Sequence, residues 1–317
     1  MAKILLGLSG RGTIDGKFAS TARVGKDEVA KVIRDDFDFR TYSFALPLKQ
    51  VSQVLFGLSE EQMWNDKLKN VPVEPWGLSP RTIFQRVGTE AGRLVFDESM
   101  WAKMAMLVWD DVQQGKPYAL THTANVSEFG PAPQTPEDFD KMLDMAVQTM
   151  LQLDPSDIAQ SRLMNSPLAN WPFSFEEVKA LVIEKSIPRV LGLEDGMTRD
   201  SSQWQDYVAK RSTLPMVVRV GCGPYGVPSG VANGLVVPDN RFDNEADIIR
   251  ENNGTVIHVC RELPSDIELV QGHASEQGVT PKTGDLYVHN DGSLEDLKNK
   301  TVELVQSLQS PSPELSV

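Results

Sequence analysis

Apolar residues follow a strand period and a helix period in turn along the first part of the chain. Residues 3–8 include an unbroken apolar run typical of a buried strand, and residues 26–35 place apolar side chains at helical spacing. The same periods predict further strands over residues 41–45, 234–238, 255–260 and 285–289. They predict further helices over residues 47–57, 80–95, 99–114, 244–253 and 293–308. Strands that alternate with helices predict an α/β fold with a parallel sheet covered on both faces.

The middle of the chain, residues 119–231, has a different character. Proline, methionine and tryptophan are frequent there, and no strand pattern of the kind seen at the ends recurs. Ser174 stands where a helix N-cap is expected, and Glu177 completes a capping box with it. Helical patterns cover residues 137–152, 155–164, 175–185 and 201–211.

This change of character predicts how the domains are arranged. Residues 1–118 and 232–308 are expected to form one α/β domain in two parts, with residues 119–231 as a mostly helical insertion between them. The sequence leaves the role of this insertion open between an enlarged lid, a dimerisation element and a docking domain. Residues 309–317, rich in serine and proline, are expected to be a disordered tail.

The composition is typical of a globular protein that acts on small molecules. Of the 317 residues, 40% are hydrophobic and 24% are charged, and the formal net charge is −13. Nucleic acid is an unfavourable partner for such a chain, because surfaces that bind DNA are normally basic. No apolar run approaches the ~18 residues of a membrane span, and the first apolar run is too short for a signal peptide. Since the chain has only 2 cysteines, we expect no disulfide framework and a reduced, cytoplasmic setting.

A Gly-Lys pair lies between a predicted strand and a predicted helix, in the segment from Ala22 to Asp27. In this position, N–H groups at the helix N-terminus bind phosphate oxygens, and Lys26 can reach the outer phosphates. The strict phosphate-binding motif has Ser or Thr after the lysine, but the carboxylate of Asp27 can also hold Mg²⁺. An ordinary glycine turn before a helix, with a surface lysine, explains the same residues without a ligand.

The first glycine of that motif is also displaced. Ser20 stands where the strict motif has glycine, so Gly10 is the natural candidate, and residues 11–21 would then be inserted in the loop. This inserted segment contains a second pair, Gly16-Lys17, which precedes no helical pattern.

The predicted helix that begins at Pro80 carries groups suited to phosphate and base recognition. Arg81, Gln85 and Arg86 lie within about one helical turn of one another. Arginine binds phosphate through two parallel hydrogen bonds, and a neighbouring glutamine can read a base edge. A solvated basic helix face explains the same spacing.

A further candidate segment, from Val236 to Glu245, follows the strand pattern of the second part of the α/β domain. Asp239 lies at the carboxyl end of a predicted parallel strand, where ligands bind in open α/β sheets. It could orient Mg²⁺ or the attacking phosphate, and Arg241 could neutralise the phosphate of the substrate. A turn in which Asn244 and Glu245 cap the next helix is the alternative interpretation.

Two more segments complete the set. His273 to Glu276 carries His, Ser and Glu close together, downstream of Arg261. The run Asn290-Asp291-Gly292 precedes the last predicted helix, where turn and cap chemistry alone explains these residues.

Together and in this order, the segments resemble those of the bacteriophage deoxynucleoside monophosphate kinases, relatives of adenylate and dephospho-coenzyme A kinases in the P-loop kinase superfamily. The resemblance covers residues 1–118 and 232–308. It implies a P-loop kinase three-layer fold and a Mg²⁺-dependent transfer of phosphate from ATP to a deoxynucleoside monophosphate. The matching segments are Leu8 to Gly10 with Ala22 to Asp27, Tyr42 to Lys49, Gln85 to Arg93 with Trp101, Asp239 to Glu245, Thr255 to Arg261, His273 to Glu276, and Gly284 to Leu297.

The resemblance also implies a role for each candidate residue. The residues expected to bind ATP are Gly10, Arg23, Gly25, Lys26, Asp27 and the turn Asn290, Asp291, Gly292, with Asp27 also the candidate Mg²⁺ ligand. The residues expected to act in catalysis are Lys26, Arg86, Asp239 and Arg241. The residues expected to bind the acceptor are Lys49, Arg81, Gln85 and Arg93.

The chain departs from the family pattern at several positions. The family usually has Asp where this chain has Leu46 and Thr where it has Glu28, and residues 11–21 and 119–231 match nothing in it. Two other functions therefore stay open: a P-loop kinase with another acceptor, such as a modified base in phage DNA or a coenzyme A precursor, and a non-catalytic nucleotide-binding protein. A homodimer is possible, and a phage origin would place the protein in the host cytoplasm.

Overall fold

The computed structural model describes residues 2–116, 126–223, 231–265 and 278–309. The chain divides into two compact units. Unit 1 comprises Met1–Phe44, Ala105–Tyr118 and Pro228–Val317, and unit 2 comprises Ala45–Met104 and Ala119–Val227. Residues 45–104 therefore cluster with the middle of the chain, and each unit is described below by itself.

Unit 1 is built on a sheet in the order β3-β6-β1-β7-β8, in which all neighbouring strands are parallel. The chain leaves β1 toward β3 on one side and leaves β7 toward β8 on the other. Ligands bind at the carboxyl ends of strands where the direction of winding reverses in this way. The strands are β1 (Ile4–Ile14), β3 (Phe39–Thr41), β6 (Gly234–Asn240), β7 (Thr255–Glu262) and β8 (Leu286–His289).

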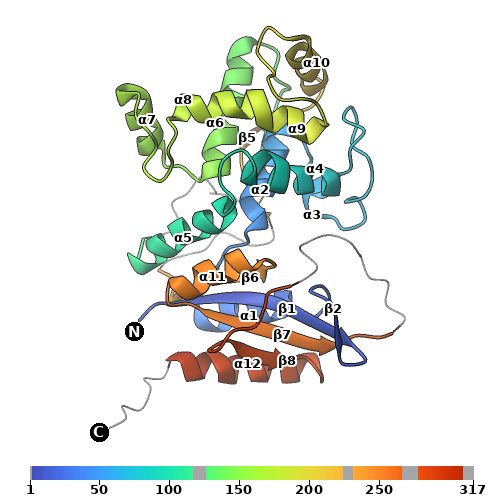
Figure 1. Cartoon of the computed structure of the whole chain (residues 1–317), viewed down its shortest axis with the longest axis vertical. Helices are drawn as coiled ribbons and strands as arrows, with labels where there is room; N and C mark the ends of the chain where they lie inside the picture. Colours follow the sequence, from blue (N-terminus) through green and yellow to red (C-terminus); the bar gives the residue numbers. More distant parts are fainter. Residues whose placement is uncertain (1, 117–125, 224–230, 266–277, 310–317) are drawn as a thin grey trace. The chain divides into compact units, whose positions relative to one another are not determined.

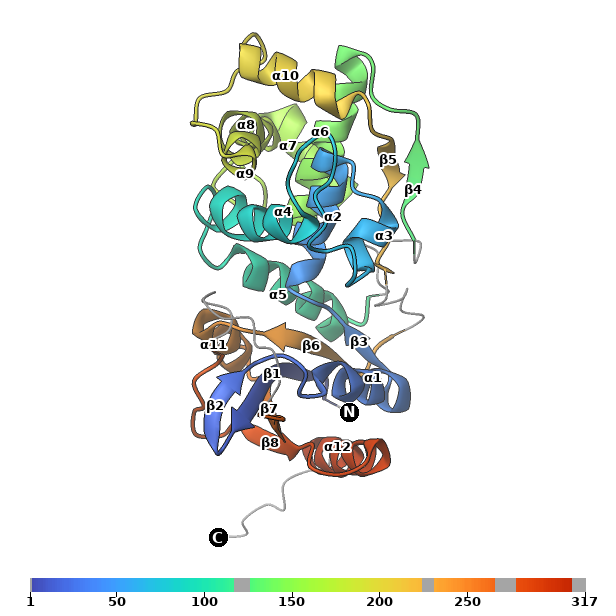
Figure 2. The same cartoon turned by 90° about the vertical axis from the view of Figure 1, so that its right-hand side faces the viewer.

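Helices cover both faces of this sheet (Figures 1 and 2). α1 (Lys26–Phe37) and α12 (Leu294–Gln309) lie together on one face, and α11 (Asp243–Glu251) lies on the other. Alternate residues of the central strand face the two layers, as period 2 requires: Leu6 and Leu8 pack with apolar residues of α1 and α12. This three-layer arrangement confirms the α/β fold class predicted from the sequence.

The first strand is longer than its apolar run. It was expected to end at residue 8 but continues to Ile14, and β2 (Lys17–Ser20) then pairs antiparallel with it. Asp15 and Gly16 form the turn, both with positive φ (50° and 72°), as two-residue hairpins require. The segment expected as a loop insertion is thus mostly a β-hairpin, and Gly16-Lys17 lies at its turn.

The strand expected over residues 41–45 was placed too far along the chain. β3 ends at Thr41, and Ala45 is already the first residue of the next helix, α2 (Ala45–Phe56). Between them, Ser43 and Phe44 bind Asp239, as described below.

Unit 2 consists mainly of helices, with one antiparallel pair of strands, β4 (Glu128–Gly130) and β5 (Met216–Arg219), among its described residues. The predicted helices over 80–95 and 175–185 each divide, because an α-helix continues as a π-helix. The capping box between Ser174 and Glu177 is confirmed, with the Ser174 N–H donating to Glu177 Oε2 at 2.7 Å. The helices are α2, α3 (Glu60–Trp64), α4 (Pro80–Arg86), η1 (Val87–Arg93), α6 (Pro136–Leu151), α7 (Pro155–Met164), α8 (Phe175–Leu181), η2 (Val182–Ser186), α9 (Ile187–Leu191) and α10 (Ser202–Arg211).

One helix, α5 (Met100–Gln113), contains the boundary between the units, which falls after Met104. Its residues up to the boundary cluster with unit 2 and the later ones with unit 1. Within the described part of the chain, no helix is both long enough and apolar enough to span a membrane.

Candidate active site

The Gly-Lys pair opens α1, as its spacing predicts. Gly25 is the N-cap residue with φ of 97°, Lys26 is the first helical residue, and Arg23 also has a positive φ of 62°. A left-handed conformation at Gly25 carries no steric cost for glycine and a real one for residues with a Cβ. The first N–H groups of α1 have no partner within the helix, and together with the helix dipole they favour an anion at this end.

Gly10 meets this loop even though it lies on β1. A Cβ atom at Gly10 would lie 2.0 Å from the carbonyl oxygen of Thr21, so only glycine lets the chain cross directly over the strand here. Ser20 Oγ accepts a hydrogen bond from the Ala22 N–H at 3.0 Å and helps to turn the chain after β2. The structure thus brings Gly10 and Gly25 into one loop system despite the hairpin between them.

Two side chains from neighbouring strands hold carbonyl groups of this loop. Asn290, directly after β8, donates from Nδ2 to the Val24 carbonyl oxygen at 2.9 Å. Arg261, in β7, donates from its guanidinium to the Arg23 carbonyl oxygen at 3.3 Å. Arg261 is a residue to which the sequence assigned no role, although its place near the carboxyl end of a parallel strand is a usable signal.

The turn after β8 has partners of its own. Lys300 bonds to the Asp291 carboxylate and to the His289 carbonyl oxygen, and the hydrogen bond from Lys300 lowers the pKa of Asp291. A Cβ atom at position 292 would lie 2.5 Å from Asp296 Oδ2, so a larger residue there would have to displace that side chain. Turn and cap chemistry therefore accounts for the contacts of Asp291 and Gly292, whereas Asn290 faces the loop before α1.

Asp239 lies near the end of β6, the strand beside β1. Its Oδ2 accepts from Ser43 Oγ at 2.6 Å, and its Oδ1 accepts from the Phe44 N–H at 3.0 Å. Arg241 is exposed, and Glu245 Oε2 accepts from the main-chain N–H groups of Arg241 (2.9 Å) and Phe242 (3.2 Å). The capping interpretation is thus confirmed for Glu245, while Asp239 has different partners.

The acceptor candidates lie in unit 2, on α2, α4 and η1. The Lys49 ammonium lies 4.2 Å from the ring centroid of Trp64 and 5.6 Å from that of Phe84. Arg81 and Gln85, four residues apart, share one face of α4. Arg86 points elsewhere and donates to the Val190 carbonyl oxygen at 2.7 Å, which uses one of its five N–H donors.

Arg93, the last acceptor candidate, is half-buried at the end of η1. The π-helical turn that leads to it is fixed by Trp101, whose indole N–H donates to the Gly88 carbonyl oxygen at 2.8 Å. π-Helical turns of this kind are frequent at functional sites.

The metal candidate is a single carboxylate. Asp27 is exposed in the first turn of α1, and in the described part of the chain no three His, Cys, Asp or Glu side chains group as metal ligands. A single carboxylate is a donor that Mg²⁺ can use, because Mg²⁺ is usually bound by one or two carboxylates, waters and substrate phosphates. His273 to Glu276 lies outside the described residues.

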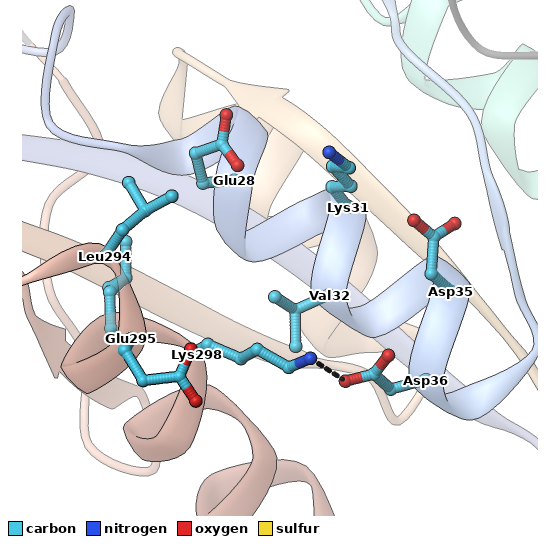
Figure 3. Close-up of a pocket in the computed structure, with 9 residues that line it drawn as sticks. Glu28, Lys31, Val32, Asp35, Asp36, Leu294, Glu295 and Lys298 are labelled. Atoms are coloured by element: carbon cyan, nitrogen blue, oxygen red, sulfur yellow. Dashed lines mark ion pairs between the residues drawn. The ribbon is translucent and has the colours of Figure 1, made fainter.

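Glu28, the unusual neighbour of Asp27, lines a different surface. It borders a groove of about 220 Å³ between α1 and α12, together with Lys31, Leu294 and Lys298 (Figure 3). Lys298 pairs with Asp36 across this groove at 3.4 Å. Glu28 therefore lies at the groove between α1 and α12.

A buried charged cluster under α11 was not foreseen from the sequence. His258 Nε2 lies 2.9 Å from Asp285 Oδ2, and Arg250 binds the same carboxylate through two hydrogen bonds of 3.0 and 2.7 Å. Burial alone would raise the pKa of Asp285, but the bonds from Arg250, the Lys282 N–H and His258 lower it to about 2. Burial lowers the pKa of His258. The sequence feature that could have indicated this cluster is His258, a histidine inside the apolar run of β7.

Comparison with known proteins shows that part of this arrangement is similar to one family. Residues 229–301 match the family model described as deoxynucleotide monophosphate kinase. The deoxynucleotide monophosphate kinase of Enterobacteria phage T4 is 43% identical over 65 residues, which are 20% of this chain and 26% of the phage protein. That of Escherichia phage RB69 is 39% identical over 71 residues, 22% of this chain and 28% of the phage protein.

The chain thus spans only about a quarter of the length of these relatives. The segment that matches the family model nevertheless includes Asp239, Arg241, Arg261 and Asn290, which lie on β6 and β7 or in the turns after β6 and β8. The similarity to the deoxynucleotide monophosphate kinase family thus rests on residues 229–301.

Proposed function

We propose that the protein transfers a phosphoryl group from ATP to a deoxynucleoside monophosphate, forming the diphosphate. One observation carries the proposal. Asn290 and Arg261, both inside the segment that matches the kinase family, hydrogen-bond to the loop that ends at Gly25-Lys26. The family segment and the loop suited to phosphate are therefore parts of one structure, although they lie far apart in the sequence.

The residues of unit 1 would hold the phosphate chain of ATP. The N–H groups at the start of α1 and the Lys26 ammonium offer donors and positive charge to it. Gly10 and Gly25 fit this role, because a side chain at either position would collide with Thr21 or Asn290. Asp27 would hold Mg²⁺, which neutralises charge on the phosphates when it is bound.

Arginine and lysine side chains of unit 2 would bind the acceptor. Lys49, Arg81, Arg86 and Arg93 offer positive charge for its phosphate, and the exposed Gln85 offers hydrogen bonds to a base. The nucleophile is a phosphate oxygen that is already ionised, so no general base is needed. Catalysis then consists of positioning and of neutralising charge.

Turnover with ATP, Mg²⁺ and each of the four deoxynucleoside monophosphates, followed in an assay coupled to ADP formation, tests the proposal directly. Lys26→Ala should abolish transfer without changing the thermal unfolding temperature. Lys31→Ala, which removes an exposed lysine from the same helix, is the matched control and should keep wild-type turnover.

The outcomes separate the remaining functions. Turnover with a coenzyme A precursor or with modified DNA, and none with any monophosphate, would show that the protein phosphorylates a different acceptor. ATP binding without transfer to any acceptor would indicate a non-catalytic nucleotide-binding protein. Wild-type turnover in Lys26→Ala would show that the Gly25-Lys26 loop is not the phosphate site.

A further inference from the structure

The loop before α1 is held by side chains that come from other strands. Asn290 binds the Val24 carbonyl oxygen at 2.9 Å, and Arg261 binds the Arg23 carbonyl oxygen at 3.3 Å. Two successive carbonyl groups are thus drawn toward the β7 and β8 side of the loop. The loop's conformation is therefore imposed from outside it.

This arrangement fixes where the N–H groups point. In a trans peptide, the C=O and the following N–H point in opposite directions. With the Arg23 and Val24 carbonyl groups turned to Arg261 and Asn290, the N–H groups of Val24 and Gly25 turn the other way. Successive N–H groups that converge in this manner form an anion-binding concavity. Neither N–H donates to another residue within the described part of the chain.

Asn290 is the better placed of the two anchors. Its own N–H donates to the Cys260 carbonyl oxygen at 2.8 Å, which fixes it to the end of the sheet. Its amide also lies against Gly25, where a Cβ would be only 2.6 Å from Nδ2. Arg261, by contrast, is exposed and its bond is longer. The side-chain amide of Asn290 is therefore the main link between the sheet and this loop.

We propose that Asn290 is a positioning residue for phosphate binding: by holding the Val24 carbonyl group, it aims the Gly25 N–H at the phosphates of the nucleotide. This inference rests on the proposed function for the identity of the ligand. It differs from a contact to adenine, the role that the family resemblance implies for this turn. The two roles predict different losses when the Asn290 side chain is changed.

Binding of ATP and of inorganic tripolyphosphate to the full-length protein, measured by titration calorimetry, separates these roles. Asn290→Asp replaces the donor with a carboxylate that repels both the carbonyl group and the phosphates. At pH 8, Asn290→Asp should bind each ligand at least roughly tenfold more weakly than the wild type does. Lower affinity for ATP alone would show an adenine contact and overturn the inference.

The pH dependence supplies a readout that a loss of stability would not give. A protonated carboxyl group can donate to the Val24 carbonyl oxygen, whereas an ionised one cannot. The affinity of Asn290→Asp for tripolyphosphate, relative to wild type, should therefore recover as the pH falls from 8 toward 4, where an aspartate carboxyl takes up a proton. The uncharged Asn290→Ala should lose about threefold to tenfold at every pH.

Asn233 offers a matched control, because its Nδ2 also donates to a main-chain carbonyl oxygen. The acceptor is the carbonyl oxygen of Phe37, the last residue of α1, at 3.1 Å. Asn233→Asp should bind tripolyphosphate like wild type. If Asn290→Asp does not fold, Asn290→Ala and Asn290→Ser carry the test, and wild-type affinity in either overturns the inference.

The inference and the proposed function fail in distinguishable ways. Tripolyphosphate binding that depends on Asn290, without transfer to any monophosphate, would contradict only the function. Transfer by wild-type protein with unchanged tripolyphosphate affinity in Asn290→Ala would contradict only the inference. A wild-type protein that binds neither ligand overturns both.

Discussion

The Asp239 carboxylate and Ser43 are joined by a hydrogen bond of 2.6 Å, with the carboxylate at the end of β6 and the serine just after β3. The second carboxylate oxygen accepts from the next residue, through the Phe44 N–H at 3.0 Å. Both oxygens of Asp239 thus hold the segment that leads out of β3. This carboxylate is therefore fixed in place beside the strand that carries Gly10.

Replacing Asp239 should affect turnover more than folding. Asp239→Asn removes the negative charge and keeps one acceptor, so we expect kcat to fall at least about tenfold, as for loss of an oriented charged group. Ser43→Ala, which removes one hydrogen bond and leaves the carboxylate in place, should lower kcat much less. Steady-state kinetics with thermal unfolding of both variants provide the measurement, and equal kcat values in the two would contradict a role for the charge.

A methyl group at Gly10 should displace the loop. Because the Cβ of Gly10→Ala would lie 2.0 Å from the Thr21 carbonyl oxygen, the chain must move, at a cost of about 1–3 kcal/mol. We expect a lower unfolding temperature and ATP binding weakened at least roughly tenfold. Gly16→Asn is the control in the same hairpin, because the space around Gly16 is open and asparagine tolerates its positive φ. Unchanged ATP affinity in Gly10→Ala would separate the hairpin from the phosphate site.

Acid should destabilise the protein through the cluster under α11. The pKa of Asp285 is lowered from 3.8 to about 2 in the folded protein. This carboxylate therefore contributes fully to the free energy of unfolding above pH 3.8, and its contribution is lost as the pH falls toward 2. Burial also lowers the pKa of His258 from 6.5, so the unfolded chain binds its proton more readily and stability falls below about pH 6.5.

Two variants separate these two windows. Asp285→Asn should flatten the change in unfolding free energy between pH 4 and 2, and His258→Phe should reduce the change between pH 7 and 5. Chemical denaturation across this pH range provides the measurement. An identical pH profile for wild type and His258→Phe would show that this histidine does not resist protonation in the folded state.

Trp64 should support acceptor binding through Lys49. The ammonium lies 4.2 Å from the Trp64 ring centroid, a geometry that stabilises the cation and restricts its position. For Trp64→Leu we expect the KM for the monophosphate to rise about threefold or more with little change in kcat, since a cation–π contact contributes about 0.5–1 kcal/mol. Trp64→Phe keeps a ring and should preserve most of the affinity, whereas an unchanged KM in Trp64→Leu would argue against this role.

The local elements and the chemistry at their ends could be predicted from the amino-acid sequence. The apolar runs of β1 and β7 and the helical period from Lys26 onward predict the layers of unit 1, because burial of one face imposes these periods. Ser174 and Glu177 likewise predict a helix start, because a capping box involves only residues three apart. The Gly-Lys pair before a helix could be recognised as well, because it also involves only residues that are close in the sequence.

The contacts between groups far apart in the sequence became known from the folded structure alone. No period connects Asn290 to Val24, Arg250 to Asp285 or Gly10 to Thr21, since these contacts depend on the order of strands in the sheet. The turn at Asp15-Gly16 likewise reverses a strand whose apolar run had already ended at Leu8. Hydrophobic patterns record which face of each element is buried, but polar contacts between elements depend on how those faces are assembled.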